Sequence, residues 1–286
     1  MKINRKQSYR FKKAIKPRYK KRTALRICAG LVIVASIVLN PSSYKNNTPE
    51  STSVNATRYE KAQITSVNIE GEKKRTEEAI TTEEPTAGYV ALTYDDGPSP
   101  TITPEILQIL RDNNSVATFF VLGSRVILYP DVVLETYLDG NEIGNHGYDH
   151  QAFTNLTTDE IHQQITVTDE AIIAITNKVP TFVRPPYGAI TKDIADQINR
   201  PLILWSIDSN DWRNIPADII IDNVMSQLQD GSIILFHDIH RKTLEISREL
   251  IPMIIEAGYE LVTLEQLFEI KEVQVEPSKI YHKAKK

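Results

Sequence analysis

The segment GYVALTYDDGPSP, residues 88–100, combines an apolar run with two adjacent carboxylates. Tyr89–Tyr94 is short and rich in β-forming residues, which predicts a buried strand. Asp95 and Asp96 follow at its carboxyl end, where a Gly-Pro turn begins. Side chains of neighbouring extended residues point to opposite faces, so the turn must bend Asp96 round if both carboxylates are to face one cavity. The segment predicts either such a paired site or an ordinary Asp-rich turn.

Outward from this segment, short apolar runs alternate with helical patterns. The further predicted strands are 116–121, 142–144, 181–183, 202–207 and 232–236. The predicted helices are 103–112, 130–139, 157–177, 191–199, 216–229 and 243–257. This alternation predicts an α/β domain with a parallel sheet, and the number of repeats suits a barrel, with a doubly wound open sheet as the alternative. Either topology gathers its chemistry at the carboxyl ends of the strands.

Histidines occur at two of these strand ends. His146 and His150 follow the predicted strand 142–144 at i and i+4, so they would converge on one metal if a helical turn began there. His237 follows four apolar residues at the end of the strand 232–236, which suits general acid or base work. Chance or core packing would explain either feature alone.

Two more polar clusters complete the set. Arg184 and Tyr187 flank a Pro-Pro pair that fixes the backbone after the strand 181–183. Asp211 and Trp212 follow the strand 202–207, and a Trp in a polar loop is a candidate sugar-stacking platform. All five clusters fall at predicted carboxyl ends, which favours one active site over five unrelated structural features.

The N-terminal region is basic and then apolar. Twelve of the 33 Lys and Arg lie between Lys2 and Arg26, and no acidic residue precedes Glu50. An apolar run over 27–39 follows, and extending it to residue 24 gives a marginal membrane span. Positive charge before the run predicts an uncleaved signal anchor with a cytoplasmic N-terminus and an extracellular remainder. A cleaved signal peptide, giving a secreted protein, and a buried core helix are the alternatives.

Composition sets the remaining boundaries. We predict a basic cytoplasmic tail (1–23), an anchor (24–40), a flexible stalk rich in Ser, Thr, Asn and Glu (41–87), a catalytic domain (88–270) and a polar C-terminal tail (271–286). After Arg26 the chain has 21 basic against 37 acidic residues, which argues against a nucleic-acid partner. Cys28 is the only cysteine, so no internal disulfide can form. The sequence implies no protein partner.

Five motifs in this order resemble those of the polysaccharide deacetylase family, also called the NodB-homology or carbohydrate esterase 4 family. The motifs are TYDDGP (93–98), HGYDH (146–150), RPPYG (184–188), DSNDW (208–212) and LFHD (235–238). The resemblance covers about residues 88–265. It implies a distorted, partly open (β/α) barrel and hydrolysis of N-acetyl groups on a glycan, by analogy with known members of the fold.

The resemblance also implies a role for each matching residue. Asp96, His146 and His150 match a metal triad for one divalent ion, by default zinc, although cobalt, nickel or iron would also suit the ligands. Asp95 matches the general base, and His237 the general acid that protonates the departing amine. Arg184 and Asp211 resemble the residues that support this pair. The Tyr187 N–H would stabilise the oxyanion, and Trp212 and Leu235 would line the substrate groove.

One position departs from the family pattern, and several functions stay open. Gly147 stands where the family has Ser or Thr, so we expect a softer loop or a metal affinity weaker by about 1 kcal/mol, a typical net hydrogen bond. The anchor and stalk favour peptidoglycan N-acetylglucosamine as substrate. The alternatives are chitin-like oligosaccharides, poly-N-acetylglucosamine or acetylxylan, a non-catalytic glycan-binding module on the same fold, and a membrane-tethered scaffold that acts through its basic arm.

Overall fold

The computed structural model describes residue 85 and residues 87–285. The predicted cytoplasmic tail, the anchor and nearly all of the stalk lie outside these residues. Among the residues described, none of the helices is both long enough and apolar enough to span a membrane.

A parallel sheet forms the centre of the domain, as the alternation of strands and helices predicts. Five strands lie in the order β3-β2-β1-β6-β5, and every neighbouring pair is parallel. Their bounds are β1 Gly88–Asp95, β2 Thr118–Val121, β3 Glu142–Asn145, β5 Ile207–Asp208 and β6 Ile233–His237. A sixth strand, β7 (Tyr259–Leu261), pairs in parallel with the first residues of β1. Because the pairing is parallel, the carboxyl ends of β1, β3 and β6 meet at one edge.

A second, two-stranded sheet continues the arrangement. Strands β4 (Leu202–Ile203) and β8 (Ile280–Tyr281) pair in parallel. Single bridges join Val183 to Asn145 of β3 and to Leu202 of β4, and another joins Ser232 to Lys283. Residues 271–285 of the segment assigned to a polar tail from its composition thus pack on the domain, and Tyr281 and Ala284 are buried there. This segment contains too few apolar residues for the sequence alone to predict that it packs on the domain.

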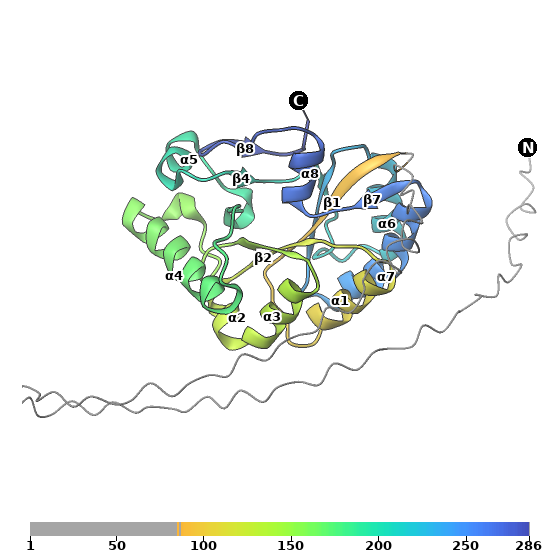
Figure 1. Ribbon diagram of the computed structural model, residues 1–286, viewed down its shortest axis with the longest axis horizontal. Helices are drawn as coiled ribbons and strands as arrows, with labels where there is room; N and C mark the ends of the chain where they lie inside the picture. The colour runs from red at the N-terminus through yellow and green to blue at the C-terminus, as the bar shows by residue number, and fades with distance from the viewer. Residues whose placement is uncertain (1–84, 86, 286) are drawn as a thin grey trace, which may run out of the picture. The chain divides into compact units, whose positions relative to one another are not determined.

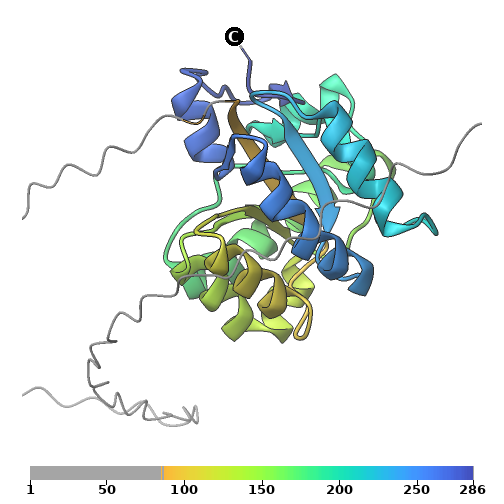
Figure 2. The ribbon, with the colours of Figure 1, turned by 90° about the vertical axis from the view of Figure 1, so that its right-hand side faces the viewer.

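Helices cover the outside of the strands (Figures 1 and 2). Their bounds are α1 Thr103–Asp112, α2 Gly123–Leu128, α3 Pro130–Leu138, α4 Thr158–Thr176, α5 Lys192–Ile198, α6 Ala217–Gln227, α7 Arg241–Glu256 and α8 Leu264–Ile270. Two 3₁₀ turns, Phe153–Asn155 and Pro186–Gly188, lie in the loops. Thr157 and Glu160 form the capping box that their spacing predicts, and α4 begins one residue after Thr157.

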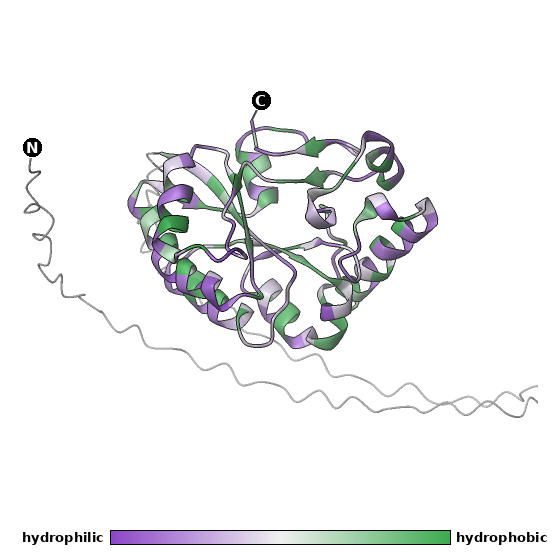
Figure 3. Ribbon diagram, turned by 180° about the vertical axis from the view of Figure 1, so that it is seen from behind, coloured by the Kyte–Doolittle hydropathy of each residue, from purple (hydrophilic) through white to green (hydrophobic). Residues whose placement is uncertain are grey.

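Strand β1 divides its side chains between two cores. Val90, Leu92 and Tyr94 pack in the large core beneath the helices, whereas Ala91 packs in the second core with Phe120 and Ile233. Seen from behind, the helices each carry both hydrophobic and hydrophilic residues (Figure 3). Because side chains alternate along a strand, Thr93 and Asp95 share the face of Ala91. Asp95 therefore lies on the same face of the sheet as Ala91, at the edge formed by the carboxyl ends of the strands.

Candidate active site

The Asp95-Asp96 pair ends β1 and turns into the carboxyl edge of the sheet. Asp95 is the last residue of the strand and is 3% exposed. Asp96 has a φ of 72°, a left-handed conformation that reverses the direction of its side chain relative to the extended chain. Both carboxylates consequently lie within 3.6 Å of His146 Nε2. The turn therefore brings both acids to the same imidazole, which is the paired arrangement and not the ordinary Asp-rich turn.

Asp96, His146 and His150 form a cluster that could hold a metal ion. Their ligand atoms all lie within 4.8 Å of one another. Asp96 Oδ1 is 3.5 Å from His146 Nε2 and 3.2 Å from His150 Nε2. Nδ1 of His146 donates to the Arg184 carbonyl at 2.7 Å, so in the neutral ring the Nε2 lone pair faces Asp96. Asp96 Oδ1 is buried and has no hydrogen-bond partner among the residues described. One orphaned carboxylate oxygen facing two imidazoles fits a divalent cation.

Two of the three side chains in this cluster have pKa values shifted in the direction that a cation site needs, whereas the carboxylates of Asp95 and Asp96 outweigh burial and raise the pKa of His146. Burial alone would raise the pKa of Asp96, but His146 and His150 outweigh it and hold that pKa well below its usual range. Burial is the main cause of a lowered pKa at His150. Asp96 is therefore ionised and His150 favours the neutral ring, which are the forms that ligate metals.

The loop between the two histidines is not the helical turn that the i,i+4 spacing suggested. Gly147 and His150 have φ values of 76° and 66°, so the chain follows an irregular path. The carbonyls of Gly147 and Tyr148 accept from the N–H groups of Gly123 and Ser124 at the start of α2, at 3.0 and 2.9 Å. The histidines converge because of this path, and not because of helical periodicity.

The structure shows what a side chain at position 147 would meet, which bears on the expectation that Gly147 softens the loop or weakens metal binding. A Cβ added there would lie 3.3 Å from Phe153 Cε1 and 3.4 Å from Gln164 Oε1. With a φ of 76°, a β-branched residue would be strained in any case. Glycine therefore suits this loop path, and the expected loss from its missing hydroxyl stays a prediction.

Arg184 holds Asp95 from beneath. Its side chain is fully buried, and Nη1 donates to Asp95 Oδ1 at 2.6 Å and to Thr93 Oγ1 at 2.8 Å. The other guanidinium nitrogens donate to the carbonyls of residues 203 and 204 at 3.2 and 3.1 Å, and the Phe120 ring lies 4.1 Å from Cζ. The guanidinium neutralises Asp95 and fixes one of its oxygens, which leaves Oδ2 on the side of His146.

His237 and Asp211 form a second acid–base pair. Nδ1 of His237 is 2.8 Å from Asp211 Oδ1, and the His237 N–H donates to Asp211 Oδ2 at 2.8 Å. Burial lowers the pKa of His237, but the bond and charge of Asp211 outweigh burial and raise it to about 9. Thr243 of α7 also donates to Asp211, which is 1% exposed. A pKa of about 9 favours the protonated imidazole at neutral pH, and because Asp211 accepts from Nδ1, the proton to be donated is the one on Nε2.

The three residues assigned to substrate contacts differ in exposure. Tyr187 is 68% exposed, has a φ of 61° and places its ring 4.4 Å from that of His150. Trp212 is 55% exposed, and the Arg213 guanidinium lies 4.7 Å from its ring centroid. Leu235 is 4% exposed within β6. Tyr187 and Trp212 therefore present accessible ring surface beside the site, whereas Leu235 is buried.

Sequence reasoning missed several side chains that support the site. Asp238, quoted only as part of a motif, is fully buried and accepts from Thr103, whose own hydroxyl accepts from the Ser99 N–H at 2.8 Å. A Cβ at Gly97 would lie 2.3 Å from Asp238, so only glycine fits there. Gln164 of α4 braces the histidine loop. The glycine after two carboxylates was a usable signal for Asp238, but no local pattern marks Gln164.

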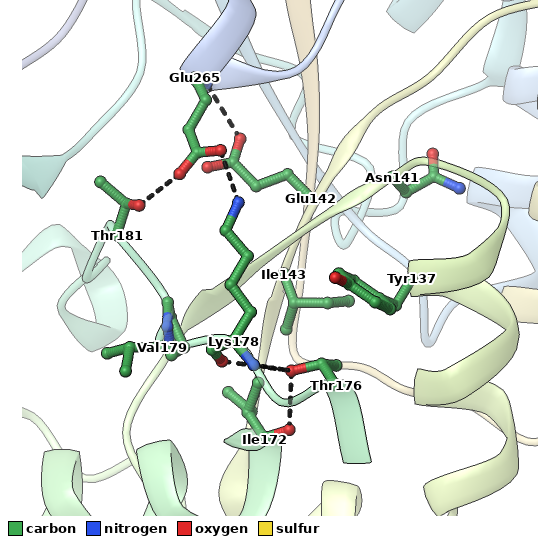
Figure 4. A pocket seen from close by; sticks show the side chains of 11 residues that line it. Tyr137, Asn141, Glu142, Ile143, Ile172, Thr176, Lys178, Val179, Thr181 and Glu265 are labelled. Atoms are coloured by element: carbon green, nitrogen blue, oxygen red, sulfur yellow. Dashed lines mark hydrogen bonds and ion pairs between the residues drawn. The ribbon is translucent and has the colours of Figure 1, made fainter. Parts of the chain in front are cut away.

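A second ionisable cluster lies at the opposite, amino ends of the strands. Glu142, the first residue of β3, accepts from Thr118 at 2.9 Å and from the Glu265 N–H of α8 at 3.2 Å. Lys178 and Thr181 both donate to Glu265, and these side chains converge on one small pocket (Figure 4). Burial, with a smaller contribution from Glu265, raises the pKa of Glu142 to about 7. The cluster ties α8 to the base of the sheet, away from the histidines.

Comparison with known proteins gives a consistent set of relatives. The family described as Polysaccharide deacetylase matches residues 82–201. The peptidoglycan-N-acetylmuramic acid deacetylase PdaC of Bacillus subtilis is 42% identical over 190 residues, 66% of this chain and 41% of PdaC. A peptidoglycan-N-acetylglucosamine deacetylase of Bacillus cereus is 37% identical over 187 residues, 63% of this chain and 68% of that protein. A family 4 acetyl xylan esterase from Clostridium thermocellum, in complex with a cobalt ion, matches with a TM-score of 0.65 and 32% identity, over 68% of this chain and 98% of that one.

Fold and site together define a parallel α/β protein with an Asp-His-His cluster that could hold a cation, beside a buried Asp–Arg pair and a His–Asp pair. The comparisons identify this class: the chain belongs to the polysaccharide deacetylase family. It spans about two fifths of the length of PdaC, the first of these relatives.

Proposed function

We propose that this protein is a metal-dependent deacetylase that removes N-acetyl groups from peptidoglycan, chiefly from its N-acetylglucosamine. The observation that carries the proposal is the convergence of an Asp-His-His cluster that could hold a cation, a buried carboxylate and an imidazole paired with Asp211 at one edge of the sheet. Amide hydrolysis needs these parts: an activated water, a stabilised oxyanion and a proton for the leaving amine. All the residues named for these tasks are present, which disfavours a non-catalytic glycan-binding module.

Each residue of the candidate site has a role in the proposed hydrolysis. Asp95, fixed by Arg184, accepts a proton from the attacking water through Oδ2. The water oxygen bonds to the acetyl carbon, the carbon–nitrogen bond breaks, and His237 gives its proton to the departing amine, so that acetate and a free amine result. Asp96, His146 and His150 would hold one divalent cation, which we propose to be zinc; when bound, it would act as a Lewis acid toward the carbonyl and would lower the pKa of the water.

The substrate is supported by the relatives and by local charge. The names of the relatives in Bacillus subtilis and Bacillus cereus specify peptidoglycan N-acetylmuramic acid and N-acetylglucosamine, respectively. Residues 85–285 contain 14 Lys and Arg against 29 Asp and Glu, so cationic groups beside the site stand out. Lys242 donates to the Arg213 carbonyl at 2.6 Å, one residue from Trp212. Neither residue forms an ion pair with a carboxylate in the described part of the chain. The positive charges of Lys242 and Arg213 beside Trp212 suit a wall glycan that carries carboxylates better than they suit neutral chitin or acetylxylan.

Acetate release by the full chain tests the proposal. The protein is incubated with peptidoglycan fragments and with neutral chitooligosaccharides, with and without a chelator. We expect chelator-sensitive acetate release, and a preference for peptidoglycan that Arg213→Ala reduces through KM. Acetate release that a chelator leaves intact would refute metal dependence, and preference for the neutral oligosaccharide would refute the substrate.

We also propose that the N-terminal segment anchors the domain at the outer face of the cell membrane, or leads it to secretion if it is cleaved. The support is the order of a basic stretch and an apolar run in residues 2–39. Fractionation of cells that express the full chain, followed by protease treatment of intact cells without their wall, tests this. Recovery in the soluble cytoplasmic fraction would contradict the proposal.

A further inference from the structure

Two side-chain amides hold the backbone between the histidines of the cation site. The three intervening residues are Gly147, Tyr148 and Asp149. The Gly147 N–H donates to Asn145 Oδ1 at 2.8 Å. The N–H groups of Tyr148 and Asp149 both donate to Gln164 Oε1, at 2.6 and 3.3 Å. Every N–H between the two ligands therefore ends on one of these two oxygens.

Gln164 makes a further bond that fixes its own amide. Its Nε2 donates to Asp149 Oδ1 at 2.8 Å, so the amide grips both the backbone and a side chain of the loop. The orientation of the amide is thus determined by one acceptor and two donors. Gln164 lies on α4, a 19-residue helix with a capping box at its start, and Asn145 Nδ2 donates to the carbonyl of Ile165 on the same helix at 2.9 Å. The brace rests on a rigid element.

The loop depends on outside support because it has no secondary structure of its own. Left-handed residues at Gly147 and His150 prevent a regular internal hydrogen-bonding pattern. The first residues of α2 hold its carbonyls, and Gln164 holds its N–H groups on the other side. Removing Gln164 leaves two N–H groups to water and frees the loop to separate the ligands.

We propose that Gln164 is a positioning residue that keeps His146 and His150 at the separation a divalent ion requires. The inference rests on the cation site of the proposed function. Gln164 acts through the loop and touches neither substrate nor ion. Supporting residues beyond the ligands commonly change metal affinity by about 10- to 100-fold when they are replaced.

Metal titration of the full chain tests this role without relying on catalysis. Co²⁺ is titrated into metal-free protein, and the dissociation constant is measured for Gln164→Ala, Gln164→Met and the control Gln163→Ala. Gln163 is the exposed neighbour on α4, and methionine keeps the length and aliphatic packing of Gln164. We expect the dissociation constant to rise about tenfold in both Gln164 variants and to stay unchanged in the control. The melting temperature of the metal-free protein should fall by only a few degrees.

A catalytic readout separates positioning from general damage. At saturating metal, the turnover number of both Gln164 variants should approach that of wild type, because the loss is in metal binding. Metal affinities of both variants within twofold of Gln163→Ala would overturn the inference. Tight metal binding by wild type with no acetate release would instead refute the proposed function and leave the role of Gln164 standing.

Discussion

Replacing Asp211 by Asn should disable the proposed proton donor without removing it. The amide oxygen of the new side chain would accept from the His237 N–H and Thr243, as Asp211 Oδ2 does now, and would place the amide NH₂ against His237 Nδ1. Nδ1 must then accept, so the imidazole loses its extra proton. Burial is the largest influence on the pKa of His237 and lowers it, and Asp211 supplies the main opposing influence. Without Asp211, the pKa should fall from about 9 to its usual 6.5 or below.

The size of the effect follows from that change. A fall of about 2.5 in pKa is worth about 3 kcal/mol and reduces the protonated fraction of His237 at pH 7.5 from nearly all to about a tenth. The direction of the pH dependence is that of a histidine with a raised pKa: protonated His237, the proton donor, is present below the pKa of the folded protein and is lost as pH rises through that pKa. The basic limb of the kcat profile should therefore move from near pH 9 to near pH 6.5, with about a tenfold loss at pH 7.5.

Two measurements check this prediction. The His237 ring is titrated by NMR in metal-free protein, where no cation competes, and kcat is measured against pH in the loaded enzyme. Asp208→Asn is the matched control, because Asp208 ends β5 three positions before Asp211 and accepts from the Asn210 N–H instead of contacting His237. If Asp211→Asn titrates like wild type, or keeps its rate at pH 8, His237 is not the proton donor that we describe.

Four further substitutions probe the same structure. Asp95→Asn should abolish acetate release while elemental analysis finds metal still bound. It should also lower the melting temperature, because Arg184 loses its buried charged partner, which costs about 3–5 kcal/mol of folding free energy. Loss of metal would mean that the roles of Asp95 and Asp96 are exchanged. His146→Ala should sharply lower bound metal, and an unchanged content would refute its place as a ligand. Gly147→Thr should weaken metal binding in a chelator titration, because its left-handed φ and the contact with Phe153 strain the loop; tighter binding would show that the missing hydroxyl matters more. Glu142→Gln should raise the free energy of unfolding by about 3 kcal/mol above pH 7 and by little at pH 5. The pKa of the Glu142 carboxyl is raised from 4.5 to about 7, so the stability that the neutral carboxyl contributes is fully present below pH 4.5 and is lost as pH rises to 7. Thermal melts at both pH values check this, and an equal gain at each would contradict the raised pKa.

The parts of the fold that sequence alone predicts are those with local signals. The run Tyr89–Tyr94, the α1 bounds and the Thr157 capping box all appear as expected, because apolar periodicity and capping depend on residues a few positions apart. The predicted strand 202–207 is wrong in its middle. Residues 204–206 leave the sheet between β4 and β5, where the chain passes from one sheet to the other.

The convergence of the candidate site residues was predictable because parallel strands bring distant carboxyl ends together. Asp96 and His146 lie 50 positions apart, yet each follows directly from a strand of one sheet. Gln164 could not be found in this way, since its contact with Tyr148 depends on the packing of α4 against an irregular loop. The network of Glu142, Lys178 and Glu265 likewise depends on the docking of α8 and has no local pattern.

Adjacent, chemically identical side chains at 95 and 96 take different roles because their surroundings balance charge differently. Asp95 is neutralised by the buried Arg184, and Asp211 is balanced by the protonated His237, so neither pair needs another ion. Asp96 faces two imidazoles and keeps a buried oxygen without a hydrogen bond among the residues described. A single uncompensated carboxylate attracts a divalent cation but cannot cancel its charge, so a net positive charge remains. That remaining charge is what would polarise an acetyl carbonyl, and a second acid in the ligand set would have reduced it.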